Sequence, residues 1–414
     1  MHAAPQLKDA DVIRCPQQAH DYLLNEAPIY FDPVARFYVV SRYEDCRTLL
    51  SDNTALTSEH VGERLRGDPD PARAARIRQL FADEGWPRER AIGHYDGQDY
   101  RERRRLFESF LRAGRIREKE DEIRDIAYAL AEAIADQGEA EMVSQFCEQM
   151  SLRIIFRLLG APTDALPVIK DALDAMVANL GFVGTEEEEI AGARKEIAAQ
   201  HYFMALIESK RAHPDDTILS AFVNADLPSG ARMTDAQILM HVMLDLFMAG
   251  GETTSKALSS GIYLLCQDRA LQDRLASDPD NLLRGFAEEV LRLEGPAVGL
   301  YRLAKRDISL HGATIPQGAL VALRVAAANR DDGHFACPAS VNLERDNAAT
   351  HLSFGSGAHA CLGSYLARRE LYWGFRALLD TVRDIRVQPG SSVTYAHNWM
   401  FRAIEHLPVS YSRR

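Results

Sequence analysis

The chain has 414 residues, of which 46% are hydrophobic and 26% charged, and this composition is typical of a folded globular protein. A formal net charge of −12 argues against general nucleic-acid binding. The chain contains no run of about 18 apolar residues and no apolar leader after Met1, so we expect neither a membrane span nor secretion, and place the protein in the cytoplasm.

The N-terminal part of the chain predicts a short β-hairpin over residues 28–40, because Asp32-Pro33 supplies a turn between two apolar stretches. Residues 54–97 are rich in glycine and proline and predict loops, which could form a lid or a channel wall. Helices are predicted over residues 101–111, 116–137 and 142–159.

The clearest helix begins at Thr234, which has capping-box spacing to Gln237, and its apolar pattern continues to Leu265. At about 30 residues it would be roughly 45 Å long. It is apolar on nearly all sides and should therefore be buried.

The C-terminal half of the chain predicts short strands around one further helix. Strands are expected within residues 303–325 and 385–411, and a helix over residues 362–382. Together with the helices expected between residues 100 and 300, these elements predict a mainly α protein with small β-sheets. We expect residues 1–414 to form a single domain.

Cys361 is distinguished from the other five cysteines by its glycine-rich flank, which opens a predicted helix. The sequence contains no C-x-x-C pair, so neither a zinc ribbon nor a thioredoxin-type site is expected. A helix N-terminus presents unpaired N–H groups and a partial positive charge, which favour a thiolate. Taken alone, this loop is compatible with a structural cysteine in a glycine-rich turn.

The complete loop is more specific. Phe354, Gly355, Gly357, Cys361 and Gly363 follow the pattern F-G-x-G-x-x-x-C-x-G, which resembles the haem-binding loop of the cytochrome P450 family. The resemblance implies haem b, with Cys361 as the iron ligand and with Phe354 and Gly355 against the haem. A thiolate ligand pushes electron density onto iron and favours O–O cleavage.

The resemblance extends over nearly the whole chain and points to the soluble bacterial branch of the family. It implies the P450 fold, a helix-rich triangular prism. In that fold the haem is buried between the long central helix and the helix that follows Cys361.

A second motif lies within the long helix, where two glycines precede Glu252 and Thr253. Glycine and a carboxylate are unfavourable in a buried helix interior. The motif could be a helix break at a packing crossing or a groove for dioxygen. The resemblance implies that Ala249 contacts the haem, that Glu252 relays protons and that Thr253 hydrogen-bonds dioxygen. A locally widened helical turn is expected here.

Three cations match the family's haem-propionate ligands by position, namely Arg302, His359 and Arg104. Each taken alone would be interpreted as a surface charge. The family often has a histidine four residues before Arg104, where this chain has Tyr100. A tyrosine hydroxyl can hydrogen-bond a propionate, so we expect Tyr100 to take over part of that role.

Glu289 and Arg292 lie three residues apart in an apolar helical segment, so the pair should be buried. They match the family's E-x-x-R motif, and Arg345 lies where the family has the third partner. The implied role is structural: the three side chains hold the irregular segment beneath the haem.

The chain contains no dinucleotide-binding fingerprint, so its electrons should come from another protein. Six arginines form a basic cluster, which is either a solvated helix face or a docking surface: Arg101, Arg103, Arg104, Arg105, Arg112 and Arg115. The resemblance implies an acidic [2Fe–2S] ferredoxin, reduced by a ferredoxin reductase that uses NADH or NADPH. We expect a monomer.

The expected activity is monooxygenation, in which one atom of O2 enters a small-to-medium apolar substrate of terpenoid, aromatic or steroid type. The expected pocket residues are Met248, Val298, Trp399 and Met400, which could equally be ordinary core. A peroxygenase driven by H2O2 and a non-catalytic haem protein are the alternatives. Neither would need the Glu252–Thr253 pair.

Overall fold

A computed structural model describes residues 5–66, 70–180 and 185–414. The chain forms two compact units, each assembled from separate stretches. Unit 1 consists of Met1–Thr57, Glu120–Ser151 and Thr253–Arg414, and unit 2 consists of Ser58–Lys119 and Leu152–Glu252. A single domain over residues 1–414 stays a prediction.

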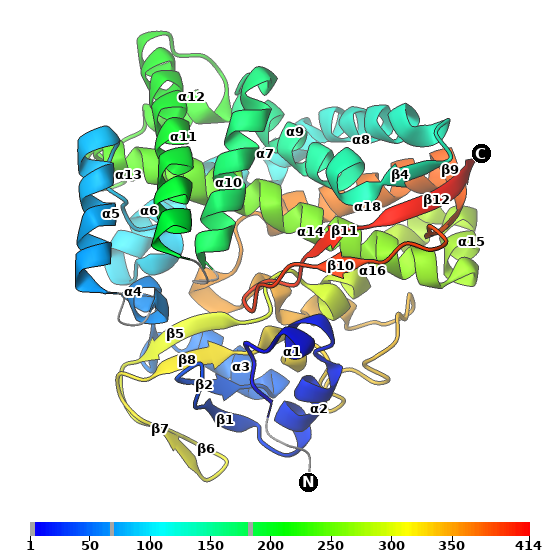
Figure 1. Ribbon diagram of the computed structural model, residues 1–414, viewed down its shortest axis with the longest axis horizontal. Coiled ribbons are helices and arrows are strands. Elements are labelled where there is room, and N and C mark those ends of the chain that lie inside the picture. The colour runs from blue at the N-terminus through cyan, green and yellow to red at the C-terminus, as the bar shows by residue number, and fades with distance from the viewer. Residues whose placement is uncertain (1–4, 67–69, 181–184) are drawn as a thin grey trace. The chain divides into compact units, whose positions relative to one another are not determined.

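Unit 1 contains a five-stranded sheet (Figure 1). Its strands, in spatial order, are β1 (Ile29–Asp32), β2 (Phe37–Val40), β8 (Leu320–Leu323), β5 (Leu300–Ala304) and β3 (Leu56–Thr57). Only β2 and β8 pair in parallel. The predicted hairpin is confirmed, and the Asp32 carboxylate closes its turn by accepting hydrogen bonds from the N–H groups of Val34 and Ala35.

Three smaller sheets also belong to unit 1 and confirm strands in the predicted C-terminal regions. They pair β4 (Glu139–Glu141) and β9 (Val382–Val387) with β12 (Pro408–Arg413), β10 (Thr394–Tyr395) with β11 (Ile404–His406), and β6 (Ile308–Leu310) with β7 (Ala313–Ile315).

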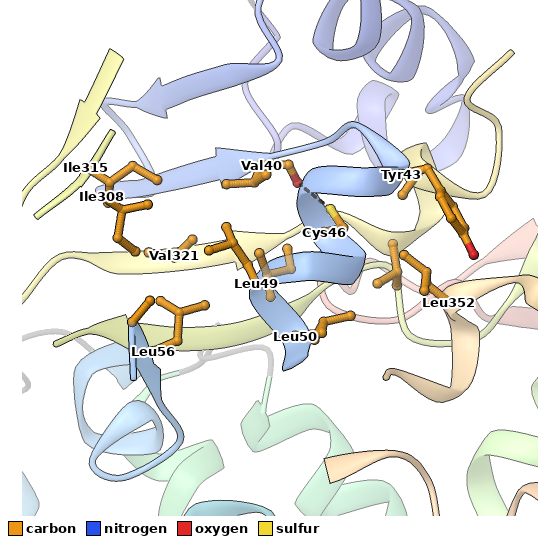
Figure 2. Close-up of a cluster of buried hydrophobic side chains, with 14 of the residues drawn as sticks. Val40, Tyr43, Cys46, Leu49, Leu50, Leu56, Ile308, Ile315, Val321 and Leu352 are labelled. Atoms are coloured by element: carbon orange, nitrogen blue, oxygen red, sulfur yellow. Dashed lines mark hydrogen bonds between the residues drawn. The ribbon is translucent and has the colours of Figure 1, made fainter. Parts of the chain in front are cut away.

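The five-stranded sheet buries one face against helix α3 (Tyr43–Ser51), as Figure 2 shows. Leu49 and Leu50 of α3 contribute to this core together with Val321 of β8. The Cys46 thiol donates a hydrogen bond to the Val40 carbonyl over 3.2 Å. Burial raises the pKa of Cys46, so this cysteine is a neutral core residue.

The helices of unit 1 surround these sheets. They include α1 (Ala10–Arg14), α2 (Gln17–Asn25), α8 (Glu120–Ala135), α15 (Arg269–Ser277), α16 (Pro279–Glu294), α17 (Val325–Ala328) and α18 (Ser364–Thr381). Helix α18 packs against α8 and α16. It also approaches α14 (Ala249–Gln267), because a Cβ on Gly374 would lie 2.9 Å from the Leu258 side chain.

Unit 2 contains helices and no strand in the part that the structure describes. Its helices are α4 (Val61–Arg66), α5 (Pro71–Glu84), α6 (Gly97–Leu111), α7 (Ala113–Glu118), α10 (Leu166–Leu180), α11 (Glu186–Ala212), α12 (Ile218–Val223), α13 (Asp235–Met240) and the π-helix η4 (His241–Met248). Helix α9 (Glu148–Leu159) passes from one unit to the other along the chain.

The prediction of loops over residues 54–97 was wrong for α5. The Asp70 side chain caps this helix at the Ala72 N–H, and Pro71 occupies its first turn. Ile77 and Phe81 bury one face against α11. Because only two of its residues are fully buried, the apolar period is weak in the sequence. Residues 67–69 of the predicted loop lie outside the described residues.

Within the described part of the chain, no helix has the length and apolar character needed to cross a membrane.

Candidate active site

The loop that carries Cys361 lies in unit 1, between two 3-10 turns and helix α18. The turns are η6 (Leu352–Phe354) and η7 (Gly357–His359). The Cys361 N–H donates a hydrogen bond to the Phe354 carbonyl over 2.8 Å. Gly355 and Gly357 have φ angles of 69° and 71°, and a Cβ on Gly357 would lie 2.9 Å from the Leu50 carbonyl oxygen. Glycine is therefore required at these turns.

Cys361 is an exposed cysteine, whereas Cys46 and Cys147 are buried. Burial raises the pKa of both buried thiols, which keeps them protonated. Cys361 precedes the first turn of α18, whose unpaired N–H groups favour a thiolate. An accessible sulfur on this loop fits the requirement for an axial haem-iron ligand.

The Phe354 ring is held by a cation on α18. The Arg368 guanidinium lies 4.6 Å from the ring centroid and hydrogen-bonds both oxygens of Glu288. The His351 Nε2 lies 3.2 Å from the same carboxylate. Burial alone would raise the pKa of Glu288, but hydrogen bonds from His351 and Arg368 bring it down to about 2. The chain segment entering the cysteine loop is thus fixed by an ionised carboxylate.

The predicted network of Glu289, Arg292 and Arg345 is formed. Glu289 and Arg292 are both fully buried and share two hydrogen bonds of 2.7 and 2.9 Å. Arg345 donates to Glu289 Oε1 over 3.0 Å. Arg292 also donates to the carbonyls of Asn329, Pro338 and Ser340. These bonds hold the irregular segment that precedes the cysteine loop.

Replacement of Glu289 by Gln should destabilise unit 1, because it leaves two poorly exposed guanidinium groups without a counter-charge. We expect a loss of about 3–5 kcal/mol in the free energy of unfolding, measured by urea denaturation. Glu344→Gln is the matched control, because the Glu344 side chain is 77% exposed. Equal stabilities of the two variants would contradict this role.

The predicted long helix is confirmed as a continuous run of α13, η4 and α14. Its N-terminus carries the capping box between Thr234 and Gln237. The widened turn expected in this helix is confirmed over His241–Met248, directly before Ala249. The Ala249 N–H reaches back five residues to the Leu244 carbonyl, as a π-helix requires.

The two glycines of this helix serve close packing. A Cβ on Gly250 would lie 2.8 Å from Ile155, and one on Gly251 would lie 2.8 Å from Leu152, both on α9. The packing-crossing interpretation therefore explains these glycines. Ala249 is exposed and Thr253 half-buried. They are four residues apart, so they share one face of the helix.

Glu252 is 6% exposed, and Lys170 of α10 lies 3.9 Å from its Oε1. Lys170 also contacts Asp174 one turn further along α10. Lys170 could not be recognised from the sequence, because a lysine four residues before an aspartate has the spacing of an ordinary surface pair. Nothing local connects Lys170 with Glu252, which lies 82 positions later.

A second acid lies beside α14. Glu370 of α18 is 1% exposed, and burial raises its pKa well above the usual range, an effect that a hydrogen bond with Thr254 only partly offsets. Burial therefore favours the protonated form of Glu370, which lies next to the residue that follows Thr253. The sequence offered no signal for it beyond an acid in an amphipathic helix.

The four predicted propionate ligands are divided between the units. In unit 2, Arg104 Nη1 donates to the Tyr100 hydroxyl over 3.2 Å, and Arg104 Nε donates to Glu108 over 2.6 Å. The structure thus brings Tyr100 and Arg104 together. In unit 1, Arg302 lies on β5 and donates to the Tyr301 carbonyl, and His359 ends the turn η7.

Three of the four predicted pocket residues lie together in unit 1. The Val298 N–H donates to the Met400 carbonyl over 3.1 Å, so the two predicted wall segments are adjacent. The neighbouring Trp399 is 4% exposed and stacks on Phe37. Met248 is the last residue of η4, in unit 2.

Residues 58–394 match the family model of cytochrome P450. A putative cytochrome P450 123 of Mycobacterium tuberculosis is 28% identical over 98% of this chain and 96% of its own length. A steroid C26-monooxygenase of the same species is 29% identical over 75% of this chain and 82% of its own length.

Solved structures agree with these sequence relatives. The P450 haem domain of Tepidiphilus thermophilus is 25% identical, with a TM-score of 0.87 over 98% of this chain and 95% of its own. Cytochrome P450 CREJ, solved with (4-ethylphenyl) dihydrogen phosphate, is 25% identical, with a TM-score of 0.89 over 99% of both chains. The fold and the family model together define a monooxygenase type of enzyme. The chain belongs to the cytochrome P450 family of monooxygenases.

Proposed function

We propose that this protein binds haem b through the Cys361 thiolate and hydroxylates a small-to-medium apolar substrate in the cytoplasm. The accessible Cys361 thiol supports this proposal above all, since positive-φ glycines hold it at the start of α18. When bound, the haem would supply the iron chemistry that activates O2 and transfers one oxygen atom to a C–H bond.

The residues of this chain would hold the cofactor from several directions. Cys361 would be the iron ligand, and Phe354 and Gly355 would contact the haem beside it. Arg302, His359 and Arg104 would neutralise the two propionates, and Tyr100 would add a hydroxyl through its contact with Arg104. Ala249 lacks a bulky side chain and would leave room for the cofactor.

Beside the haem, Thr253 would donate a hydrogen bond to dioxygen, and Glu252 would supply protons. Glu252 is buried, and the Lys170 ammonium lies 3.9 Å from its carboxylate, which is an ion-pair distance.

The CO difference spectrum tests the ligand. Reduced protein with CO should show the red-shifted Soret band of a thiolate-ligated haem, and Cys361→Ala should abolish that band. Cys337→Ala is the matched control, because Cys337 is another exposed cysteine of unit 1. A normal haem–CO band in the intact protein would disprove the proposal.

Proton delivery is tested by Thr253→Ala. We expect unchanged folding and substrate binding, with product formed per NADH lowered by about tenfold or more and peroxide raised correspondingly. Thr253→Ser keeps the hydroxyl and should restore coupling. Unchanged coupling in the alanine variant would refute this role and favour a peroxygenase, for which H2O2 alone should support full turnover.

The apolar substrate class rests on the residues that line the proposed pocket, Met248, Val298, Trp399 and Met400. The relative named steroid C26-monooxygenase makes a steroid one candidate beside terpenoids and aromatics. A low-to-high-spin shift of the ferric haem on ligand addition is the corresponding screen.

Electrons would come from an acidic [2Fe–2S] ferredoxin and its NADH- or NADPH-dependent reductase, which dock on the monomeric enzyme. The structure removes Arg103 from the predicted basic surface. Arg103 is 6% exposed, and its guanidinium lies 4.0 Å from the centroid of the Tyr95 ring. Arg101, Arg105 and Arg112 are exposed and remain available.

Arg101→Gln combined with Arg112→Gln should lower the association rate with reduced ferredoxin by roughly tenfold at low salt, and high salt should remove the difference. Stopped-flow haem reduction measures this rate. Arg383→Gln changes an exposed arginine of unit 1 and serves as the control. Identical rates in all three proteins would rule out this docking surface.

A further inference from the structure

Unit 1 buries an arginine that takes no part in the proposed catalytic or haem site. Arg324 is the N-cap residue of α17, and its backbone is fixed because its N–H donates to the Val40 carbonyl over 2.8 Å. Arg324 as a whole is only 4% exposed. Helix α2, which carries His20, packs beside α17. We call the group of His20, Tyr301 and Arg324 the inner cluster.

The inner cluster presents hydrogen-bonding atoms without partners. Among the described residues, both ring nitrogens of His20 and the Arg324 Nε have no hydrogen-bond partner, whereas the Tyr301 hydroxyl interacts with Arg324. His20 is 4% and Tyr301 6% exposed. Buried polar atoms in native proteins are nearly always satisfied. The unsatisfied atoms of His20 and Arg324 therefore indicate a site for something that accepts hydrogen bonds.

The nearest carboxylates are already used elsewhere. Asp32 is fully buried, and its two oxygens accept hydrogen bonds from the backbone N–H groups of Leu7, Val34 and Ala35. Glu294 is shared by Arg330 and Arg402.

Within the described chain, no carboxylate lies within ion-pair distance of Arg324. A guanidinium stays charged in proteins, so the cluster carries a positive charge that the Asp32 carboxylate offsets only from beyond ion-pair distance. Burial and the neighbouring Arg324, Arg330 and Arg402 lower the pKa of His20 well below its usual value, so His20 is neutral and adds no charge of its own.

An aromatic wall adjoins the inner cluster. Tyr301, Phe37 and Trp399 contact one another, with ring centroids 5.5 to 5.9 Å apart. The half-buried Lys8 places its ammonium 4.7 Å from the Trp399 ring. The wall also borders the proposed pocket, because Trp399 precedes Met400, which pairs with Val298.

We propose that Arg324, Tyr301 and His20 bind the carboxylate or phosphate group of an amphipathic ligand whose apolar part packs against Phe37 and Trp399. The guanidinium supplies the charge and directed donors, and the Tyr301 hydroxyl and one His20 N–H complete the hydrogen bonds to the anion. The idea that this ligand is the substrate rests on the proposed function. The anion site itself does not depend on that function.

The first experiment measures binding by calorimetry on the full-length, haem-loaded chain. Decanoate and decyl phosphate should both bind and raise Tm. Methyl decanoate should bind at least about tenfold more weakly than decanoate, because it carries no charge for Arg324. The relative affinities of the two anions distinguish a carboxylate site from a phosphate site. Equal affinity for decanoate and its methyl ester, or no binding of either anion, would overturn the proposal and leave buried water as the partner of these atoms.

The second experiment replaces Arg324 by Met, which removes the charge and keeps an unbranched side chain. We expect the affinity for the preferred anion to fall by about tenfold or more, and the Tm of the ligand-free protein to rise by about 2 °C or more, since an unpaired buried charge is lost. Arg383→Met, at an exposed position, should change neither quantity. A purely structural arginine would give a lower Tm and unchanged affinity, which would contradict the proposal.

The two proposals fail separately. Anion affinity and Tm report on the inner cluster, and the CO band reports on the thiolate ligand. If the protein shows the thiolate band but binds no anion, only the proposed role of the inner cluster is disproved. If it binds the anion but lacks that band, only the proposed haem-thiolate function is disproved. A spin shift produced by decanoate but not by its ester would identify the amphipathic ligand as substrate.

Discussion

The buried carboxylate of Glu289 is the interaction on which the irregular half of unit 1 depends. Its two oxygens receive Arg292, Arg345 and the Asn342 N–H, and Arg292 in turn binds three backbone carbonyls. Those carbonyls belong to a segment without regular structure, which has few hydrogen bonds of its own to hold it. The segment leads into the cysteine loop, so the position of Cys361 is secured from α16 before any cofactor binds.

Short-range contacts hold the chain segment before Cys361 in place. Arg368 places its charge over Phe354, and the Phe354 carbonyl receives the Cys361 N–H. Glu288 neutralises Arg368 and precedes Glu289 on the same helix. Adjacent acids on α16 thus hold the two ends of one chain segment.

Helix α14 shows how one element serves packing and chemistry on different faces. Gly250 and Gly251 face the side chains of α9, while Ala249 and Thr253 stay accessible. The π-helical turn before Ala249 shifts the helix face that follows it. The inner cluster of His20, Tyr301 and Arg324 differs from the packing face and the accessible face of α14. It keeps a buried charge that lowers the stability of the fold.

The sequence by itself determined the features that depend on neighbours in the chain. The Cys361 loop follows from its glycines and the helix behind it, the long helix from its capping box and apolar period, and the Glu289–Arg292 pair from its spacing. The hairpin over residues 28–40 follows from Asp32-Pro33 and from two apolar strands.

Only the tertiary structure decided the contacts between distant residues. Helix α5 was missed because two buried side chains make a weak pattern, and the burial of Arg103 was missed because charge alone suggests a solvated face. The Lys170–Glu252 contact and the inner cluster join residues tens or hundreds of positions apart. Local sequence specifies backbone conformation, but which side chains meet, and which charges are left uncompensated, depends on how separate elements pack.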